Sequence, residues 1–412
     1  MRRVLILVEN LPSPFDRRVW QEACTLRDAG YEVSIICPTG TGCEGRFEVI
    51  DGVHIYRYRL PLEAAGAAGY VLEYLAALTQ TFILSWRVLF TRGFDVVQAC
   101  NPPDLLFLVG AFFKLFGKKF LFDHHDLCPE LYEAKFGRRD LLYRVQLWLE
   151  RATFRAADVS IATNDSYRQI AITRGGMSPT RVFVVRSGPS FARMQRLPPD
   201  ERLKRGRRYL VGYVGVIGQQ EGIDSLLRSV QHLVFELGRR DIHFGVVGSG
   251  PSLERMKALA GRLGVAQFVT FTGRVPDREL LAMLNTAEVC VNPDTANDMN
   301  DKSTMNKVLE YMALGKPIVQ FDLTEGRRAA REAALYARRH DPADFAAKIV
   351  ELIDDPTRRA AMGSFGRRRV ETQLEWSHQA PWLLAAYDAL WQRGAGALPA
   401  GRGGRMDTGS PR

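Results

Sequence analysis

Two successive series of short apolar segments, each interleaved with helical patterns, most strongly constrain the fold of this chain. An apolar run of strand length without polar alternation is typical of a parallel strand buried on both faces. Parallel strands need helical crossovers, and right-handed crossovers cover both faces of a sheet. We therefore predict an α/β fold with two doubly wound, Rossmann-like domains that face each other across a cleft. The expected strands are residues 4–10, 32–38, 95–100, 119–125, 158–163 and 182–188 in the first series, and 209–217, 242–248, 268–273, 288–293, 317–322 and 334–337 in the second.

A polar, basic segment separates the two series. Residues 196–208, RLPPDERLKRGRR, contain prolines and no apolar periodicity, which is typical of an exposed linker. We expect an N-terminal domain over residues 1–195 and a C-terminal domain over 209–375, in keeping with the length of 412 residues. A final helix is expected over 376–393, and the Gly-, Arg- and Pro-rich tail 394–412 is expected to be disordered. Near the start of the second domain, a helical pattern has one apolar face made by Ile223, Leu226, Leu227, Val230, Leu233, Val234 and Leu237.

The charge balance and the cysteines narrow the class of protein. Lysine and arginine outnumber aspartate and glutamate by 56 to 46, and such a surface attracts nucleotide phosphates, acidic lipid headgroups or nucleic acid. Arginines are spread over both halves and no nucleic-acid-binding signature is present, so we do not expect nucleic acid as a partner. The six cysteines form no CxxC pair, and the apolar run at the N-terminus is too short for a signal peptide. We expect a cytoplasmic protein.

The segment 72–90 is the most apolar stretch of the chain. Glu73 and Arg87 leave 13 uncharged residues between them, whereas a membrane-spanning helix needs about 20. Two interpretations stay open: a buried helix of the first domain, or a helix that touches the membrane interface with Trp86, Arg87 and Arg92 at one end. The second would place the protein peripherally on the inner face of the membrane.

The strongest local signal is STMNKVLEYMALGKPIVQFD, residues 303–322. A polar loop opens a helix that ends at Gly315 and feeds directly into a strand, and a helix N-terminus at that edge of a sheet attracts anions. Lys307 is expected to offer its ammonium to a diphosphate, and Glu310 its carboxylate to ribose hydroxyls. The alternative is a capped surface helix with an ordinary Lys/Glu pair. The residues expected to offer backbone donors are Ser303, Thr304, Met305 and Asn306.

Four segments carry a resemblance to a known family: LEYMALGKPIV (309–319), residues 246–293, residues 12–38, and FDHHDLCPELY (122–132). They resemble the two domains of family 4 glycosyltransferases, and the similarity covers nearly the whole chain except the tail. The resemblance implies the GT-B fold, an acceptor-binding first domain and a second domain that binds a nucleoside diphosphate sugar. It also implies transfer with retention of configuration, without a metal or other cofactor.

The family's E-x7-E motif is only half present. By the resemblance, Glu310 matches the second glutamate, which holds the donor ribose. Eight residues earlier, where the first glutamate is expected near the transferred sugar, the chain has Lys302, with Asp301 beside it. Either Asp301 substitutes through a shifted loop, or Lys302 meets the phosphates.

A second departure concerns the diphosphate. Where the family has an Arg after a glycine and a Lys before the next one, this chain has Val216 after Gly215, and Glu221. Because a departing diphosphate needs positive charge or aligned dipoles, we expect Lys307 and Lys302 to replace the lost cations.

Two further loops are assigned through the resemblance. Gly248 and Gly250 of VVGSGP are expected to line the nucleotide pocket, and the loop at Arg274 is expected to meet the base.

In the first domain, His125 matches the family's histidine that contacts the donor sugar and the reacting centre. A purely structural histidine is the alternative. Asp123, His124, His125 and Asp126 also suggest metal ligands, but adjacent strand residues point to opposite faces, so we expect no metal.

Charged residues follow the first strand where the family has a glycine-rich turn. No glycine occurs between Asn10 and Gly30, so we expect Arg17 or Arg18 to contact a phosphate through its side chain. The alternative is a helix start with Asp16 as N-cap and both arginines solvated. Glu130 either binds acceptor hydroxyls or simply begins a helix.

The sequence thus predicts a retaining glycosyltransferase of the hexosyltransferase type. We expect a nucleotide sugar as donor and a sugar or lipid-linked hydroxyl as acceptor, in cell-surface polysaccharide or glycolipid synthesis, with an anionic membrane surface as a further partner. Two alternatives stay open. One is an epimerase of the same fold, and the other is a non-catalytic nucleotide-sugar-binding or scaffolding subunit, favoured by the missing Glu, Arg and Lys.

Overall fold

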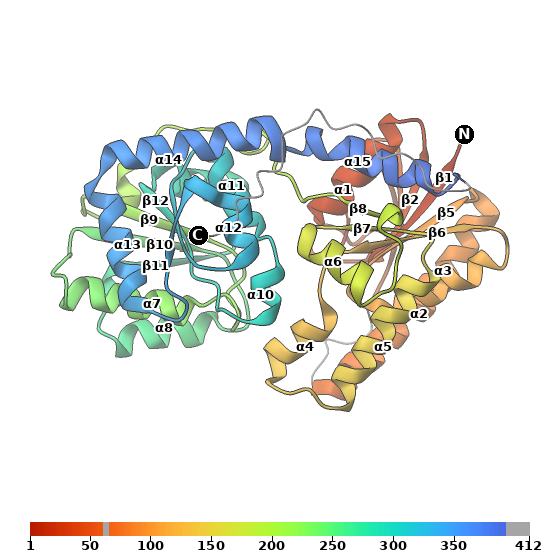
Figure 1. Ribbon diagram of the computed structural model, residues 1–412, viewed down its shortest axis with the longest axis horizontal. Coiled ribbons are helices and arrows are strands. Elements are labelled where there is room, and N and C mark those ends of the chain that lie inside the picture. The colour runs from red at the N-terminus through yellow and green to blue at the C-terminus, as the bar shows by residue number, and fades with distance from the viewer. Residues whose placement is uncertain (61–65, 393–412) are drawn as a thin grey trace, which may run out of the picture.

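The computed structural model describes residues 1–60 and 66–392, in which two α/β domains lie side by side (Figure 1). The first sheet has the order β3-β4-β2-β1-β5-β6-β7-β8 and the second β11-β10-β9-β12-β13-β14. This confirms the predicted fold class. The tail predicted to be disordered lies outside the described residues. The strands are β1 (Arg3–Leu7), β2 (Glu32–Pro38), β3 (Phe47–Ile50), β4 (Val53–Tyr58), β5 (Val96–Cys100), β6 (Lys119–His124), β7 (Val159–Ala162), β8 (Val182–Val184), β9 (Tyr209–Val214), β10 (Ile242–Val247), β11 (Val269–Gly273), β12 (Val289–Asn292), β13 (Ile318–Phe321) and β14 (Ala334–Ala337).

Helices cover both faces of each sheet, as expected for parallel strands joined by crossovers (Figure 1). In the first domain they are α1 (Arg17–Asp28), α2 (Gly66–Thr91), α3 (Phe107–Lys114), α4 (Cys128–Phe136), α5 (Leu141–Ala156) and α6 (Asp165–Thr173). Later in the chain they are α7 (Ile223–Phe235), α8 (Leu253–Arg262), α9 (Asp277–Thr286), α10 (Asp298–Lys302), α11 (Asn306–Leu314), α12 (Thr324–Ala330), α13 (Pro342–Asp354), α14 (Pro356–Arg369) and α15 (Trp376–Ala389).

One edge of the first sheet departs from the predicted parallel pattern. Strands β3 and β4 were not predicted, and they pair antiparallel, with Phe47 opposite Tyr56. The turn between them is Asp51-Gly52, and both residues have positive φ angles, 47° and 79°. This is the backbone that a two-residue hairpin matching the strand twist requires.

The predicted apolar helix is α7, with one correction. Ile223, Leu226 and the other apolar positions through Val234 are buried in the core of the second domain. Leu237 instead follows the end of α7 at Phe235 and is 41% exposed. The helix stops two residues short of it, at a turn that contains Gly238 with φ 66°.

Helix α15 returns to the first domain. Leu383, Ala386 and Tyr387 are buried in the same core as Val4 and Ile6 of β1. The Tyr387 hydroxyl donates to Gln98 Oε1 at 2.5 Å, inside the first sheet. The chain therefore crosses between the domains a second time, along α14 and α15 (Figure 1).

Candidate functional site

The carboxyl-terminal edges of the two sheets meet through the loop that precedes α11. The side-chain amide of Asn164, just after β7, donates to the Lys302 carbonyl at 2.9 Å and to Thr304 Oγ1 at 3.2 Å. The hydroxyls of Tyr167 and Ser303 lie 3.0 Å apart. The predicted anion-binding loop is therefore docked on the first domain, and side chains of both domains converge here.

Helix α11 begins and ends where the sequence predicts. It starts at Asn306 after Met305, without a side-chain cap, and ends at Gly315, which has φ 72°. The positive end of its dipole is therefore not compensated by an N-cap side chain. Helix α10, which Asn297 caps through its side chain, was not predicted.

Glu310 lies in the first turns of α11 and connects the two domains. Its side chain is 15% exposed, and Oε1 accepts from Arg193 Nη1 at 2.7 Å and from Arg17 Nη1 at 3.3 Å. Both arginines also bind Asp277, at 2.7 and 3.2 Å. The contacts described for the chain leave Oε2 of Glu310 without a hydrogen bond, so this oxygen is available to a ligand.

Lys307, which is predicted to offer its ammonium to a diphosphate, is paired within its own domain. Its Nζ lies 2.7 Å from Oδ1 of the buried Asp294 and 3.4 Å from the Tyr213 hydroxyl. Burial lowers the pKa of Lys307, but Asp294 and Tyr213 more than compensate and raise it above its usual value. Oε2 of Glu221 and Oδ2 of Asp294 are buried without a hydrogen-bond partner. Lys307 therefore compensates carboxylates of its own domain before any phosphate arrives.

The two residues predicted to stand in for the missing glutamate, Asp301 and Lys302, both have partners in the structure. Both carboxylate oxygens of Asp301 are engaged: Thr324 donates its N–H at 3.0 Å and its hydroxyl at 2.8 Å, and Arg339 donates at 2.6 Å. Asp301 thus holds the start of α12, and Oδ2 accepts only the Thr324 hydroxyl among the described contacts. Lys302 Nζ lies 3.6 Å from Glu130 and 3.8 Å from Asp298, at the ends of facing helices.

Glycines let three loops of the second domain pack backbone against backbone. The Gly215 N–H donates to the Val247 carbonyl at 3.1 Å, and the Gly248 N–H to the Gly273 carbonyl at 3.0 Å. A Cβ at Gly248, which has φ 140°, would collide with the Gly215 carbonyl oxygen, and one at Gly250 would collide with Ile217. Only glycine allows this close approach. These loops form a backbone-lined floor beside Lys307.

Arg274 makes a contact across the domains. Its guanidinium lies 5.6 Å from the ring centroid of Phe15, in the loop before α1. The structure thus places the predicted base-contacting loop opposite the loop between β1 and α1 of the other domain.

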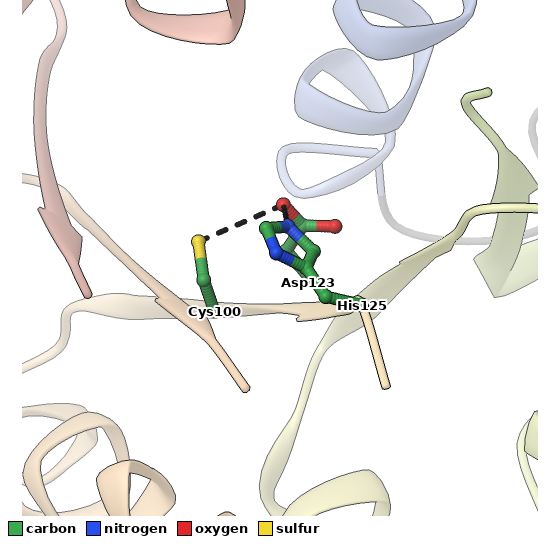
Figure 2. Close-up of side chains that lie close together, drawn as sticks. All are labelled: Cys100, Asp123 and His125. Carbon is green, nitrogen blue, oxygen red and sulfur yellow. Dashed lines mark hydrogen bonds and ion pairs between the residues drawn. The ribbon is translucent and has the colours of Figure 1, made fainter. Parts of the chain in front are cut away.

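His125 belongs to a buried ionic cluster at the end of β6. Figure 2 shows its ring and the Cys100 thiol beside the Asp123 carboxylate, with His125 Nε2 at 2.5 Å and Cys100 Sγ at 3.6 Å from Oδ2. Burial alone lowers the pKa of His125, but Asp123 raises it above its usual value. Nε2 therefore carries a shared proton, and only Nδ1 remains for a ligand.

Arg18 closes this cluster and is unavailable to a phosphate. It is 7% exposed, and it donates to Asp123 at 2.9 Å and lies 3.1 Å from Glu22. Arg18 Nε also approaches His125 Nε2 at 3.0 Å, but that nitrogen shares its proton with Asp123. Asp16 caps α1 by accepting from the Val19 N–H at 3.1 Å. The alternative that Asp16 is the N-cap of a helix start is therefore confirmed. The alternative is wrong for the arginines, because Arg17 is half exposed but paired with Glu310 and Asp277, and Arg18 is buried.

Cys100, Asp123 and His125 have ligand atoms within 4.8 Å of one another, a spacing that suits a metal ion. The same Asp123 carboxylate binds the Arg18 guanidinium, so a divalent ion would lie beside a fixed positive charge. His124 points away from this group, and burial followed by the charge of Arg174 lowers its pKa to about 3. The donor set therefore fits a proton-sharing network better than a metal.

Glu130 begins α4, as one of its two readings predicts, and its carboxylate is occupied. Arg174 donates to both of its oxygens, at 2.7 and 3.1 Å. Glu130 also lies in the wall of a cavity of about 290 Å³ between α4 and α10, with Arg139 and Asp298. The helix-start reading is therefore confirmed, and an acceptor role of Glu130 stays a prediction.

Sequence reasoning missed the residues that hold the predicted ones in place. Arg193 and Asp277 position Glu310, and Asp294 pairs with Lys307. None belongs to an apolar period or a motif, because each partner is far away in the chain. One signal was available. Glu310 and Lys307 are charged residues in a helix expected to be partly buried, and a buried charge needs a partner of opposite charge.

Two family models match the chain. Residues 208–355 match the glycosyl transferases group 1 model, and residues 16–188 match the glycosyl transferase 4-like domain. A D-inositol 3-phosphate glycosyltransferase of Thermomonospora curvata is 31% identical over 278 residues, which are 61% of this chain and 62% of that protein. The chain thus spans less than two thirds of that relative's length.

Solved structures agree on the architecture. Sucrose-phosphate synthase from Thermosynechococcus elongatus superimposes with a TM-score of 0.78 at 18% identity, covering 95% of this chain and 99% of that one. HepE of Anabaena in complex with UDP and glucose gives a TM-score of 0.72 at 14% identity, covering 94% and 100%. At identities this low, the two superpositions show a common fold alone.

Proposed function

Because the chain belongs to the family built from a glycosyl transferase 4-like domain and a group 1 domain, we propose that it transfers a sugar from a nucleoside diphosphate donor to a hydroxyl acceptor. The observation that carries this proposal is Glu310. Its carboxylate lies at the start of α11, in the region where both domains meet, and Arg193 fixes one oxygen while the other has no partner. A carboxylate held in this way suits the two hydroxyls of a ribose.

The diphosphate is bound differently in this proposal from what the sequence indicated. Lys307 and Lys302 are paired with carboxylates, so neither is a free replacement for the lost cations. The uncapped N-terminus of α11 remains as a donor, whereas the Gly215 and Gly248 N–H groups already donate to carbonyls of neighbouring loops. Aligned backbone dipoles stabilise a leaving diphosphate without a cation, and no metal or other cofactor is required.

The related proteins suggest the donor. HepE is solved with UDP and glucose, and a mannosyltransferase of Mycolicibacterium smegmatis, 31% identical over 222 residues, is named as GDP-mannose-dependent. Retention of configuration and a role in cell-surface polysaccharide or glycolipid synthesis complete the proposal. A panel of UDP- and GDP-sugars, with nucleotide release measured with and without EDTA, tests it. Release that depends on an acceptor and resists EDTA is expected, and release without transfer to any acceptor would contradict it.

A non-catalytic nucleotide-sugar-binding subunit is the second candidate. It is favoured by Glu221, which stands where the family has a cation, and by Asp294, because together they place two carboxylates beside Lys307. Saturable binding of a nucleotide sugar without turnover, under every acceptor tried, would support this alternative.

Helix α2 supports peripheral membrane contact as part of the proposal. Its exposed residues include Leu72, Leu75, Ile83 and Phe90, and Trp86 stacks on Phe90 with ring centroids 5.5 Å apart. Within residues 1–60 and 66–392, no helix is long and apolar enough to cross a membrane. A partly exposed apolar helix on a basic protein suits an anionic membrane surface. Co-sedimentation with phosphatidylglycerol vesicles at low salt is expected, and its absence would contradict the membrane role.

A further inference from the structure

A cavity of about 590 Å³ lies between the two domains, at the edge of the second sheet that carries β14. Arg186 and Asp165 come from the first domain, and the other lining residues come from the second. Helices α6 and α12 face each other across this region (Figure 1), and Ser166 donates to Glu325 between them at 2.6 Å. The lining residues are Asp165, Arg186, Asp322, Thr324, Arg327, Arg328, Arg331, Arg339 and Arg369.

The lining is strongly and unevenly charged, with six arginines against two aspartates. Part of this charge is compensated. Arg186 binds Asp165 at 2.5 Å, Arg327 binds Asp322 at 2.8 Å, and Arg328 binds Glu325 at 2.7 Å. Arg339 likewise bonds Asp301.

Arg369 and Arg331 have no such partner among the described residues. Arg369 donates only to neutral groups, which are the Ala329 and Arg328 carbonyls and the Gln373 amide oxygen. Burial, followed by the charges of Arg331 and Arg186, lowers the pKa of Arg369 to about 10. Three guanidinium groups therefore repel one another around one cavity.

Arg331 also has an unusual backbone. Its φ of 48° and ψ of −125° lie in a region that favours glycine. A glycine at position 331 would relieve this strain. The arginine keeps it and places a guanidinium in the lining of the cavity.

We propose that this cavity is a second anion site, which binds a small ligand bearing a phosphate or diphosphate group and thereby bridges the two domains. Guanidinium groups recognise phosphate oxygens through paired N–H donors, and a volume of about 590 Å³ exceeds the need of a single ion. The site is separate from Glu310. Asp277 binds the same arginines as Glu310 and follows β11, at one edge of the second sheet. Arg339 lines the cavity and follows β14, at the opposite edge.

Pyrophosphate serves as the probe, titrated calorimetrically into the full chain. Two classes of site are expected, one at the donor site and one in the cavity. Arg331→Gln combined with Arg369→Gln should weaken the second class at least tenfold, since each lost charge-assisted bond contributes about 1.5 kcal/mol or more. Arg368→Gln is the matched control, because Arg368 lies on the same helix, is exposed and does not line the cavity. It should stay within twofold of the wild type.

Saturation with the nucleotide that the donor panel identifies should remove only the first class. If no nucleotide sugar in that panel is a substrate, the pyrophosphate titrations of the variants still test the second site. The proposed function and the second site can therefore fail independently. If the double variant does not fold, the exposed Arg331→Gln alone should weaken the second class at least threefold. Variants that titrate like the wild type, or a nucleotide that displaces all the pyrophosphate, would overturn the second site.

The phosphate group has two sources, a soluble compound or a lipid headgroup. Displacement of pyrophosphate from the second class by phosphatidylglycerol vesicles would identify the headgroup, and its retention would identify a soluble ligand.

Discussion

Arg193 Nη1 donates to Oε1 of Glu310 at 2.7 Å, and this contact ties the segment after β8 to the first turns of α11. Because it fixes one oxygen of Glu310, it leaves the other free to bind a ribose. Arg193 therefore positions the Glu310 carboxylate for the ribose and does not itself bind the ribose.

Replacing Arg193 by glutamine should weaken nucleotide binding about fivefold to tenfold, because a charge-assisted bond that orients Glu310 is lost. Calorimetric titration of the nucleotide measures the effect. Arg202→Gln is the matched control, since Arg202 pairs only with Asp200 and is 90% exposed. Equal affinities of the two variants would show that Glu310 needs no positioning.

Removing the Lys307 ammonium should destabilise the protein as well as the site. Lys307→Met leaves Asp294 buried and unpaired, and breaking a buried pair costs about 3 kcal/mol. Unfolding in urea should show this loss, and Lys307→Met with Asp294→Leu should recover at least half of it. A single variant as stable as the wild type would mean that Asp294 is not ionised beside Lys307.

His125 predicts a pH dependence with a definite sign. Its pKa is raised in the folded state through Asp123, so the charged ring stabilises the fold fully below its unfolded pKa of about 6.5, and this contribution is lost as pH rises through the folded value. The Tm difference between wild type and His125→Gln should therefore be largest near pH 6 and shrink toward pH 9. A difference that grows with pH would contradict the proton shared with Asp123.

The docking of α15 makes a fourth prediction. Leu383 is fully buried in the core of the first domain, so Leu383→Ala should cost about 2–5 kcal/mol and lower the Tm of that domain. Asp388→Ala, at an exposed position of the same helix, should change the free energy of unfolding by less than about 0.5 kcal/mol. Thermal melting measures both effects, and equal Tm values of Leu383→Ala and Asp388→Ala would contradict the docking of α15.

Apolar periodicity predicted the fold well. Strands β2 and β14 begin and end where the sequence indicates, because a buried parallel strand needs continuous apolar residues. Strand β3 was missed because it lies at the sheet edge and exposes Phe47 and Val49, so it lacks that pattern. Strand β4 is buried and pairs with β2, and it was missed because His54 and Arg57 interrupt its apolar run. The Asp51-Gly52 turn was the signal that marked the hairpin.

The candidate site was predictable only in part. The position of Glu310 one turn after the start of a helix follows from local sequence, and the structure places it there. The partners of Lys307, Asp301 and Arg18 could not be predicted, since each pairing joins segments that only the fold brings together. Charge alone does not show whether a side chain faces a ligand or another side chain.

The most direct test of the account compares two carboxylates that share the same arginines. Glu310 and Asp277 both bind Arg17 and Arg193, but only Glu310 is proposed to hold the ribose. Titration of the nucleotide into Glu310→Ala and Asp277→Ala should show a loss of at least tenfold for the first and less than threefold for the second. Unchanged affinity of Glu310→Ala, or equal losses in both variants, would contradict the proposed donor site.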